Sequence, residues 1–128
     1  MTDPLQVMII DDEPIVGKRL KPALEKSGYS VEVFEDGASA LQRINQKTFD
    51  IVVTDVRMDD VDGIEVLSRV TRKSPNTKVI IITGYATIEL AREALAKGAF
   101  DFIAKPFKPN DLREVIVRAA EAYRAGSK

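Results

Sequence analysis

The stretch Val7-Met8-Ile9-Ile10-Asp11-Asp12 decides the fold, because four apolar residues run directly into two carboxylates. The pattern recurs in Ile51-Val52-Val53-Thr54-Asp55 and in Val79-Ile80-Ile81-Ile82-Thr83, and the segment from Phe100 to Ala104 ends at Lys105-Pro106. In an open parallel sheet, ligands bind in the crevice beyond the carboxyl ends of the strands. The pattern therefore predicts three carboxylates, a hydroxyl and an ammonium at one rim, a site for a divalent cation and a phosphoryl group.

Composition narrows the chemistry. The 128 residues suit one domain with a normal core, and they include no Cys and no His. Disulfides, thiolate metal sites, imidazole ligands, Ser-His-Asp catalysis and phosphohistidine are thereby excluded. Any metal must be held by oxygen atoms, which favours a hard cation, so we expect Mg²⁺ with Mn²⁺ as a substitute.

Charge and hydropathy bear on partners and location. The 19 Lys and Arg residues nearly balance 20 Asp and Glu residues, so we expect no direct nucleic-acid binding and no membrane surface. The longest apolar runs have four residues, too few for a membrane span or a signal-peptide core. We therefore expect a cytoplasmic protein.

Five strand-like and five helix-like segments alternate along the chain, which predicts an α/β fold with a parallel sheet. Helical periodicity is clear in two apolar stripes, Val16, Leu20, Ala23 and Leu24, and Leu112, Ile116, Ala119, Ala120 and Tyr123. Gly28 and Gly98 are expected to end two helices. Asp36-Gly37 and Ser74-Pro75-Asn76 are expected to form loops.

The strands differ in a way that predicts their order. The segments 7–10, 51–53 and 79–82 are continuously apolar, as strands covered on both faces should be. The segments 31–35 and 100–103 contain carboxylates, which are typical of edge strands. Because consecutive strands tend to be neighbours, we predict a flavodoxin-like, doubly wound, five-stranded sheet of order 2-1-3-4-5 in a three-layer sandwich with five helices. The switch point then lies between the strands that end at Asp11-Asp12 and Asp55.

The predicted rim suits phosphoryl transfer. Carboxylates a few ångströms apart raise one another's pKa values, and a dication relieves that repulsion. A carboxylate can attack phosphorus to give an acyl phosphate, and Asp55 is the best candidate as the lone carboxylate at the middle strand end. Asp11 and Asp12 would hold the metal, with Asp12 the direct ligand and Asp11 acting through water.

Five motifs in order carry a resemblance: Ile10-Asp11-Asp12-Glu13-Pro14, Thr54-Asp55-Val56-Arg57-Met58, Asp62-Gly63, Thr83-Gly84-Tyr85 and Lys105-Pro106-Phe107. With these spacings the chain resembles the receiver domains of two-component response regulators over essentially its whole length. The stretch from Gly84 to Phe102 further resembles receivers attached to transcription activators. One departure is Asp59-Asp60, where the family often has Pro-Gly, and we expect a more acidic and more flexible loop there.

The resemblance implies roles by position. It makes Asp55 the phosphoacceptor, phosphorylated by a histidine kinase or phosphotransfer protein, and the backbone carbonyl of Arg57 a further metal ligand. Thr83 and Lys105 contact the phosphoryl oxygens, and Thr83 and Phe102 form the switch. The Lys105-Pro106 peptide is expected to be cis. Phosphorylation would change the surface of helix 4, strand 5 and helix 5, which meets an output domain, a downstream protein or a second copy of the chain.

Simpler interpretations exist for single residues. Asp11-Asp12-Glu13 before Pro14 would also begin a helix, although Asp55 and Lys105 together favour the cation site. Asp59, Asp60 and Asp62 are expected to be solvated loop and cap residues. Phe102 is expected to pack inward from its edge strand even if it also changes rotamer, and Arg57 and Tyr85 to control water access to the site.

Three other functions fit the sequence pattern less well. A phosphohydrolase with an aspartate nucleophile usually has a second acidic residue two positions later and a cap domain, whereas the acidic pair here is adjacent. Flavodoxin-like cofactor binding needs a hydroxyl- or glycine-rich phosphate loop, and Asp-Asp-Glu would repel the phosphate. A receiver that works without phosphorylation is a third alternative. We expect a switch domain rather than an enzyme. Such a domain assists only its own phosphorylation and dephosphorylation. It would span residues 1–124, with 125–128 as a tail, a linker or an artificial end.

Overall fold

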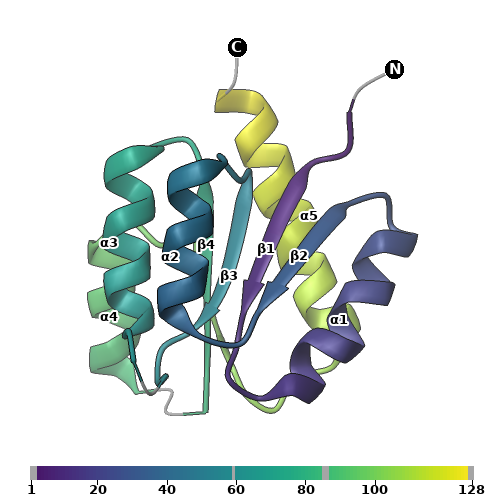
Figure 1. Ribbon diagram of the computed structural model, residues 1–128. Helices are drawn as coiled ribbons and strands as arrows, with labels where there is room; N and C mark the ends of the chain where they lie inside the picture. Colours follow the sequence, from purple (N-terminus) through teal and green to yellow (C-terminus); the bar gives the residue numbers. More distant parts are fainter. Residues whose placement is uncertain (1–2, 59, 85–86, 127–128) are drawn as a thin grey trace.

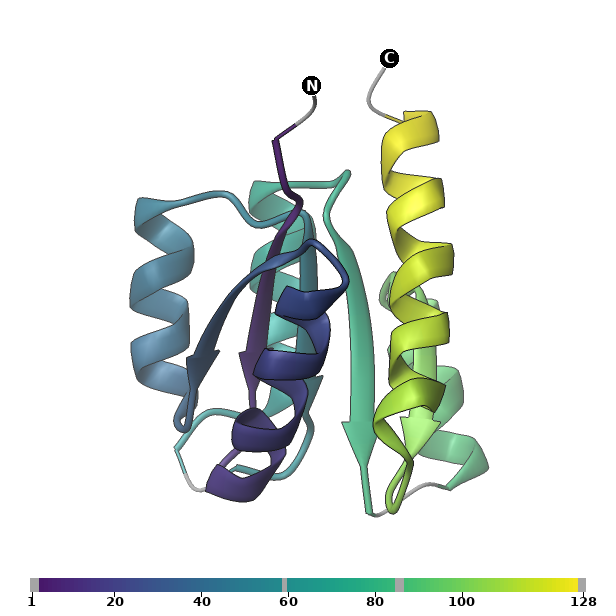
Figure 2. The same cartoon turned by 90° about the vertical axis from the view of Figure 1, so that its right-hand side faces the viewer.

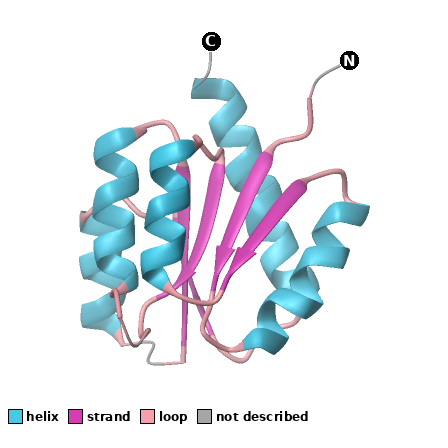
Figure 3. Ribbon diagram, in the orientation of Figure 1, coloured by secondary structure: helices cyan, strands magenta, loops and turns pink. Residues whose placement is uncertain are grey.

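A computed structural model describes residues 3–58, 60–84 and 87–126 of the chain. The fold is a parallel five-stranded sheet between two layers of helices (Figures 1 and 3). The strands are β1 (Gln6–Ile10), β2 (Ser30–Phe34), β3 (Ile51–Asp55), β4 (Lys78–Thr83) and β5 (Asp101–Ala104). The helices are α1 (Pro14–Lys26), α2 (Gly37–Gln46), α3 (Gly63–Lys73), α4 (Ile88–Ala96) and α5 (Pro109–Gly126).

The strand order is β2-β1-β3-β4-β5, which confirms the predicted topology. The charge-interrupted strands β2 and β5 are the edges, and the apolar strands β1, β3 and β4 are inside. Ile10 faces Phe34 on one side and Thr54 on the other, so β1 ends level with β2 and one residue before β3. The switch point between β1 and β3 therefore lies where the strand sequences predicted it.

Helices cover both faces of the sheet, as the two views show: α1 and α5 lie on one face, and α2, α3 and α4 on the other (Figures 1 and 2). Alternate residues of each inner strand point to opposite layers. Met8 and Ile10 pack toward α2, α3 and α4, while Val7 and Ile9 pack toward α1 and α5. This two-sided burial explains why β1 is continuously apolar.

Helix ends follow local chemistry. Gly28 and Gly98 have φ values of 97° and 103°, a backbone region that glycine adopts readily, and they lie just beyond α1 and α4 as predicted. The expectation that Asp36-Gly37 is a loop was wrong in part: Gly37 begins α2, and the Asp36 carboxylate accepts a hydrogen bond from the Ser39 N–H. Helix α5 runs to Gly126 and so includes two residues of the predicted tail; the division of the chain at 124 stays a prediction.

The strands point the same way, so their carboxyl ends form one rim, and both chain ends lie at the opposite side (Figure 1). Loops that follow the strands therefore meet at this rim, away from the termini. Among the described residues, no helix is long and apolar enough to cross a membrane.

Candidate functional site at the carboxyl ends of the strands

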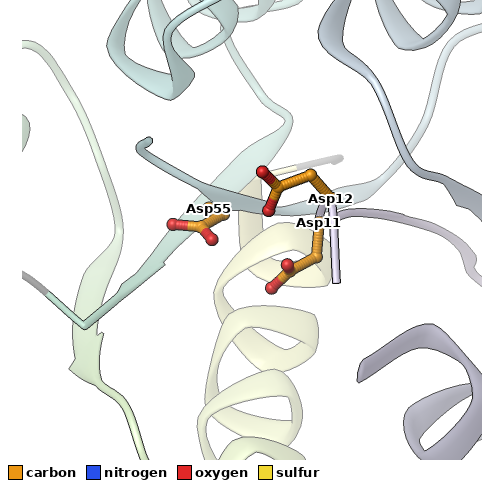
Figure 4. A group of neighbouring side chains, drawn as sticks. All are labelled: Asp11, Asp12 and Asp55. Atoms are coloured by element: carbon orange, nitrogen blue, oxygen red, sulfur yellow. The ribbon is translucent and has the colours of Figure 1, made fainter. Parts of the chain in front are cut away.

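Three carboxylates meet at the switch point. Asp11 follows the last residue of β1, Asp12 comes next, and Asp55 ends β3, which pairs with β1. One carboxylate oxygen of each residue lies within 4.8 Å of the others. Figure 4 shows the Asp11 and Asp12 side chains extending from the same stretch of chain on the side of Asp55. Residues separated by more than forty positions thus converge as the strand ends predicted.

An ammonium group reaches into these carboxylates. Lys105 Nζ lies 2.7 Å from Asp11 Oδ2, 2.7 Å from Glu13 Oε1 and 3.0 Å from Asp55 Oδ2. Its backbone N–H donates to the Thr83 carbonyl at 2.8 Å, and the following Lys105–Pro106 peptide is cis, as expected. The end of β5 is thereby tied to the end of β4, and the lysine side chain crosses the rim.

Asp11, Asp12, Glu13, Asp55 and Lys105 form what we call the rim cluster. It contains four carboxylates and one ammonium, so negative charge is in excess. Burial disfavours the charged Lys105, but the ion pairs outweigh burial and raise the pKa of its ammonium well above the usual range. Burial raises the pKa of the Asp11 carboxyl despite its contact with Lys105.

The rim cluster fits a hard dication. Its donors are carboxylate oxygens, the ligands Mg²⁺ prefers, and a dication would offset the excess negative charge. Asp11 Oδ2 is fully buried and, among the described residues, has no hydrogen bond of acceptable geometry, although it lies close to Lys105 Nζ. An oxygen whose lone pairs are incompletely used is consistent with an ion or an ion-bound water beside it.

A cleft of about 530 Å³ opens over the rim cluster. It is lined by Asp12, Glu13, Asp55, Val56, Arg57, Met58, Asp62, Gly84 and Lys105. Thr83 does not line this cleft. It is fully buried at the end of β4, one position beyond Ile82, which pairs with Asp55. The cleft thus gives Asp55 access to solvent while most of its side chain stays buried.

The loop after β3 is held close to Asp55. The Arg57 N–H donates to Asp55 Oδ1 at 3.4 Å, and the Gly63 N–H donates to the Val56 carbonyl at 2.9 Å. A Cβ at Gly63 would clash with the Asp55 backbone carbonyl, which explains the glycine there. Asp62 is exposed and caps α3, as expected of a loop or cap residue, because its Oδ1 accepts a hydrogen bond from the Ile64 N–H.

The predicted switch residues lie near different parts of the sheet. Thr83 is at the rim, whereas Phe102 lies within β5 opposite Ile81, half-buried against the α2, α3 and α4 side of the core. This inward packing matches the simpler interpretation of Phe102, and its switching role stays a prediction. Tyr85 and Asp59 lie outside the described residues.

Two contacts in the structure are not predicted by the sequence pattern. The sequence pattern assigns Glu13 no role in the site, yet Glu13 pairs with Lys105. Its position beside two other acids was a usable signal. Asp60, expected to be solvated, contacts the first backbone N–H groups of α2 across 22 and 23 residues. No local pattern indicates that contact.

Residues 7–117 match the family model described as the response regulator receiver domain. Among curated proteins, the chain is 36% identical over 121 residues to the regulatory protein AtoC and 35% identical over 118 residues to the transcriptional regulatory protein GlrR, both of Escherichia coli K12. These matches cover 94% and 92% of the chain but only 26% and 27% of the relatives, so the chain spans about a quarter of their length.

Solved structures agree in fold. A CheY-like receiver domain from Methanospirillum hungatei JF-1 has a TM-score of 0.89 and 31% identity, covering 95% of this chain and 98% of that one. A beryllofluoride-activated NtrC4 receiver domain dimer has a TM-score of 0.83 and 30% identity, with the same coverage.

Proposed function

Because this chain belongs to the family of response regulator receiver domains, we propose that Asp55 accepts a phosphoryl group from a histidine kinase or a phosphotransfer protein. The chain is a signalling switch domain of the kind found in two-component transcription regulators. The observation that carries the proposal is the rim cluster, in which one ammonium lies among carboxylates from two neighbouring strands.

The proposed step is a phosphoryl transfer. A carboxylate oxygen of Asp55 forms a bond to phosphorus as the bond between phosphorus and the donor imidazole nitrogen breaks, and the imidazole leaves with the electron pair. Lys105 and the Thr83 hydroxyl would contact the phosphoryl oxygens, over which the transition state spreads its charge. Asp11, Asp12, Asp55 and the Arg57 carbonyl would hold Mg²⁺. When bound, the ion would neutralise part of this charge. Mn²⁺ would serve in the same way.

Reversal of the modification needs access for water. Asp55 lines the open cleft, and Arg57 lies exposed at the same opening. We propose that the domain assists both its phosphorylation and its hydrolysis, and that it turns over no separate substrate. The Arg57 side chain would adjust the lifetime of the acyl phosphate by limiting water entry.

The proposed output is a population shift between two packings. Thr83 would move toward the phosphoryl group, the loop after β4 would follow, and Phe102 would turn further inward. The face formed by α4, β5 and α5 would then change. Two of these elements carry exposed apolar side chains, since Ile88 and Leu95 of α4 are 68% and 50% exposed and Val117 of α5 is 44% exposed.

Partners follow from the same surface. We propose that it meets an output domain, a downstream protein or, on phosphorylation, a second copy of the chain. One related structure is a dimer of an activated receiver domain, which supports the last alternative. We place the protein in the cytoplasm, where a kinase would supply the phosphoryl group.

The test uses a small phosphodonor. The parent and Asp55→Asn are incubated with acetyl phosphate and Mg²⁺, and intact mass spectrometry follows phosphate incorporation. Amide spectra recorded with beryllofluoride report the conformational response. We expect incorporation in the parent that requires Mg²⁺ and none in Asp55→Asn. Equal incorporation in both proteins would assign the acceptor elsewhere.

A further inference from the structure

Asp60 lies where the receiver family often has Pro-Gly, and it makes an unusual contact for a loop residue. Its Oδ2 accepts a hydrogen bond from the Ala38 N–H at 2.9 Å, and its Oδ1 accepts from the Gly37 N–H at 3.1 Å. The same Oδ1 accepts from the Val61 N–H at 2.7 Å. One carboxylate therefore joins the loop after β3 to the first turn of α2. These three N–H groups, the Ala38 bond foremost, lower the pKa of Asp60, so the carboxylate stays ionised at neutral pH.

Apolar contacts place the same two segments together. A Cβ built on Gly37 would lie 2.5 Å from the Val61 Cβ, so the start of α2 approaches the loop as closely as only glycine allows. Val61 and Met58 also pack against the core on the α2 and α3 side. The hydrogen bonds of Asp60 therefore fix a loop that is already docked.

This loop carries the residues that border the phosphoacceptor. It follows β3, which ends at Asp55, and a hydrogen bond from the Gly63 N–H to the Val56 carbonyl joins its two ends. Arg57 comes directly after Val56, and its N–H donates to the Asp55 carboxylate at 3.4 Å. Beyond Arg57, among the residues that the structure describes, the next hydrogen bonds from this loop to a different element are those of Asp60 to α2.

We propose that Asp60 is a positioning residue that holds the Arg57 backbone against the rim cluster by fastening the loop to α2, a role that rests on the proposed function. The Asp60 carboxylate would brace the loop after β3 on the side of α2. Without the hydrogen bonds from Asp60 to α2, the Arg57 carbonyl would occupy a wider range of positions. The binding of Mg²⁺ would then be weaker.

The chain supplies a matched control for this idea. Asp36 also caps α2, accepting from the Ser39 N–H at 2.7 Å, but it precedes the helix directly and makes no bond to the loop after β3 among the described residues. Asp36→Ala and Asp60→Ala each remove one exposed carboxylate that caps the same helix. Only Asp60→Ala also releases the loop.

The experiment compares the parent, Asp60→Ala, Asp60→Asn and Asp36→Ala. Mg²⁺ affinity is measured by amide NMR titration, since the chain has no Trp to report by fluorescence. We expect the Kd for Mg²⁺ to rise about tenfold in Asp60→Ala and to stay within about twofold in Asp36→Ala, by analogy with losses at groups that orient metal ligands. Asp60→Asn keeps one acceptor oxygen and should fall between. Hydrogen exchange in EDTA should be faster at Gly37, Ala38 and Val61 in Asp60→Ala.

The Mg²⁺ affinities of the variants test the positioning role of Asp60. If Asp60→Ala binds Mg²⁺ as tightly as Asp36→Ala, the positioning role is wrong. If Asp60→Ala and Asp60→Asn weaken binding equally, loss of charge explains the effect, and the role is again wrong. Asp60 is exposed, so the alanine variant should keep the native amide spectrum. If it does not, the exchange rates and Mg²⁺ affinity of Asp60→Asn decide. A parent that shows no Mg²⁺ response at all would instead refute the proposed function.

Discussion

Two groups of charged side chains in this molecule have opposite balances. In the rim cluster, one ammonium group pairs with several carboxylates: Lys105 Nζ lies 2.7 to 3.0 Å from carboxylate oxygens of Asp11, Glu13 and Asp55. On the outer strand β2, one carboxylate serves two cations. Glu32 contacts Arg43 at 2.9 Å and Lys47 at 3.0 Å, and these three residues form the edge cluster.

The difference in charge balance distinguishes a candidate binding site, the rim cluster, from a structural group of ion pairs, the edge cluster. The edge cluster leaves its anion with more positive partners than it needs, and its Arg43 bonds first, then Lys47, lower the pKa of Glu32 to about 2. The rim cluster leaves negative charge uncompensated in a largely buried place, where Asp11 and Asp55 side chains are only 1% and 8% exposed. Such an arrangement costs stability, and strongly perturbed charged groups of this kind cluster at functional sites.

Removing the single cation of the rim cluster should have the largest effect on stability. Lys105→Met leaves the buried Asp11 carboxylate without its partner, and loss of one member of a buried pair costs about 3 kcal/mol of unfolding free energy. Urea unfolding in EDTA measures the loss, and added Mg²⁺ should reduce it. Lys108→Met, which replaces an exposed lysine on the same segment, is the control. Equal losses in the two variants would mean that Lys105 does not balance the cluster.

Mg²⁺ itself should distinguish the two clusters. At a concentration 100 times the Kd, a ligand that binds only the folded state adds about 2.7 kcal/mol, and we expect this for the parent and for Glu32→Gln. Asp12→Asn should lose most of the gain, yet in EDTA it should be at least as stable as the parent, because one of three close carboxylates is neutral. Thermal unfolding with and without Mg²⁺ checks both signs. A full Mg²⁺ response in Asp12→Asn would remove Asp12 from the ion site.

The sequence predicted the rim cluster better than the edge cluster, for a physical reason. Strand ends in a parallel sheet lie at one edge whatever the loops do, so Asp11, Asp12, Asp55 and Lys105 could be placed together from strand order alone. Glu32 could be recognised only as an edge charge. Its partners lie 11 and 15 residues away on and beyond α2, and their contact depends on how that helix turns over the sheet.

The same limit applies to loops. Asp60 follows no periodic pattern, and its partners at the start of α2 precede it by 22 and 23 residues. Asp62 could be predicted as a helix cap because its partner is two residues away. Contacts within one turn can be read from a sequence, whereas contacts between a loop and another element require the packed structure.

Acid should weaken the edge cluster and leave a measurable signature. Because the folded pKa of Glu32 is below its usual 4.5, its contribution is complete above pH 4.5 and is lost as the pH falls through about 2. Glu32→Gln should cost about 1 kcal/mol at neutral pH, since the pair is partly exposed, and the difference from the parent should vanish toward pH 2. Urea unfolding at successive pH values checks this, with the exposed Glu25→Gln as control. A cost that does not change with pH would assign the effect to packing.

The smallest effect should come from Glu13, the member of the rim cluster that most resembles an edge residue. Its side chain is 59% exposed although it contacts Lys105, so Glu13→Gln should change the free energy of unfolding by less than about 0.5 kcal/mol. Its carboxylate is not one of the three that lie within 4.8 Å of one another, so the stabilisation by Mg²⁺ should persist. Thermal unfolding in EDTA and in Mg²⁺ measures both quantities. A lost Mg²⁺ response would make Glu13 a ligand, and the rim cluster would then hold its cation through a side chain that lies mostly in solvent.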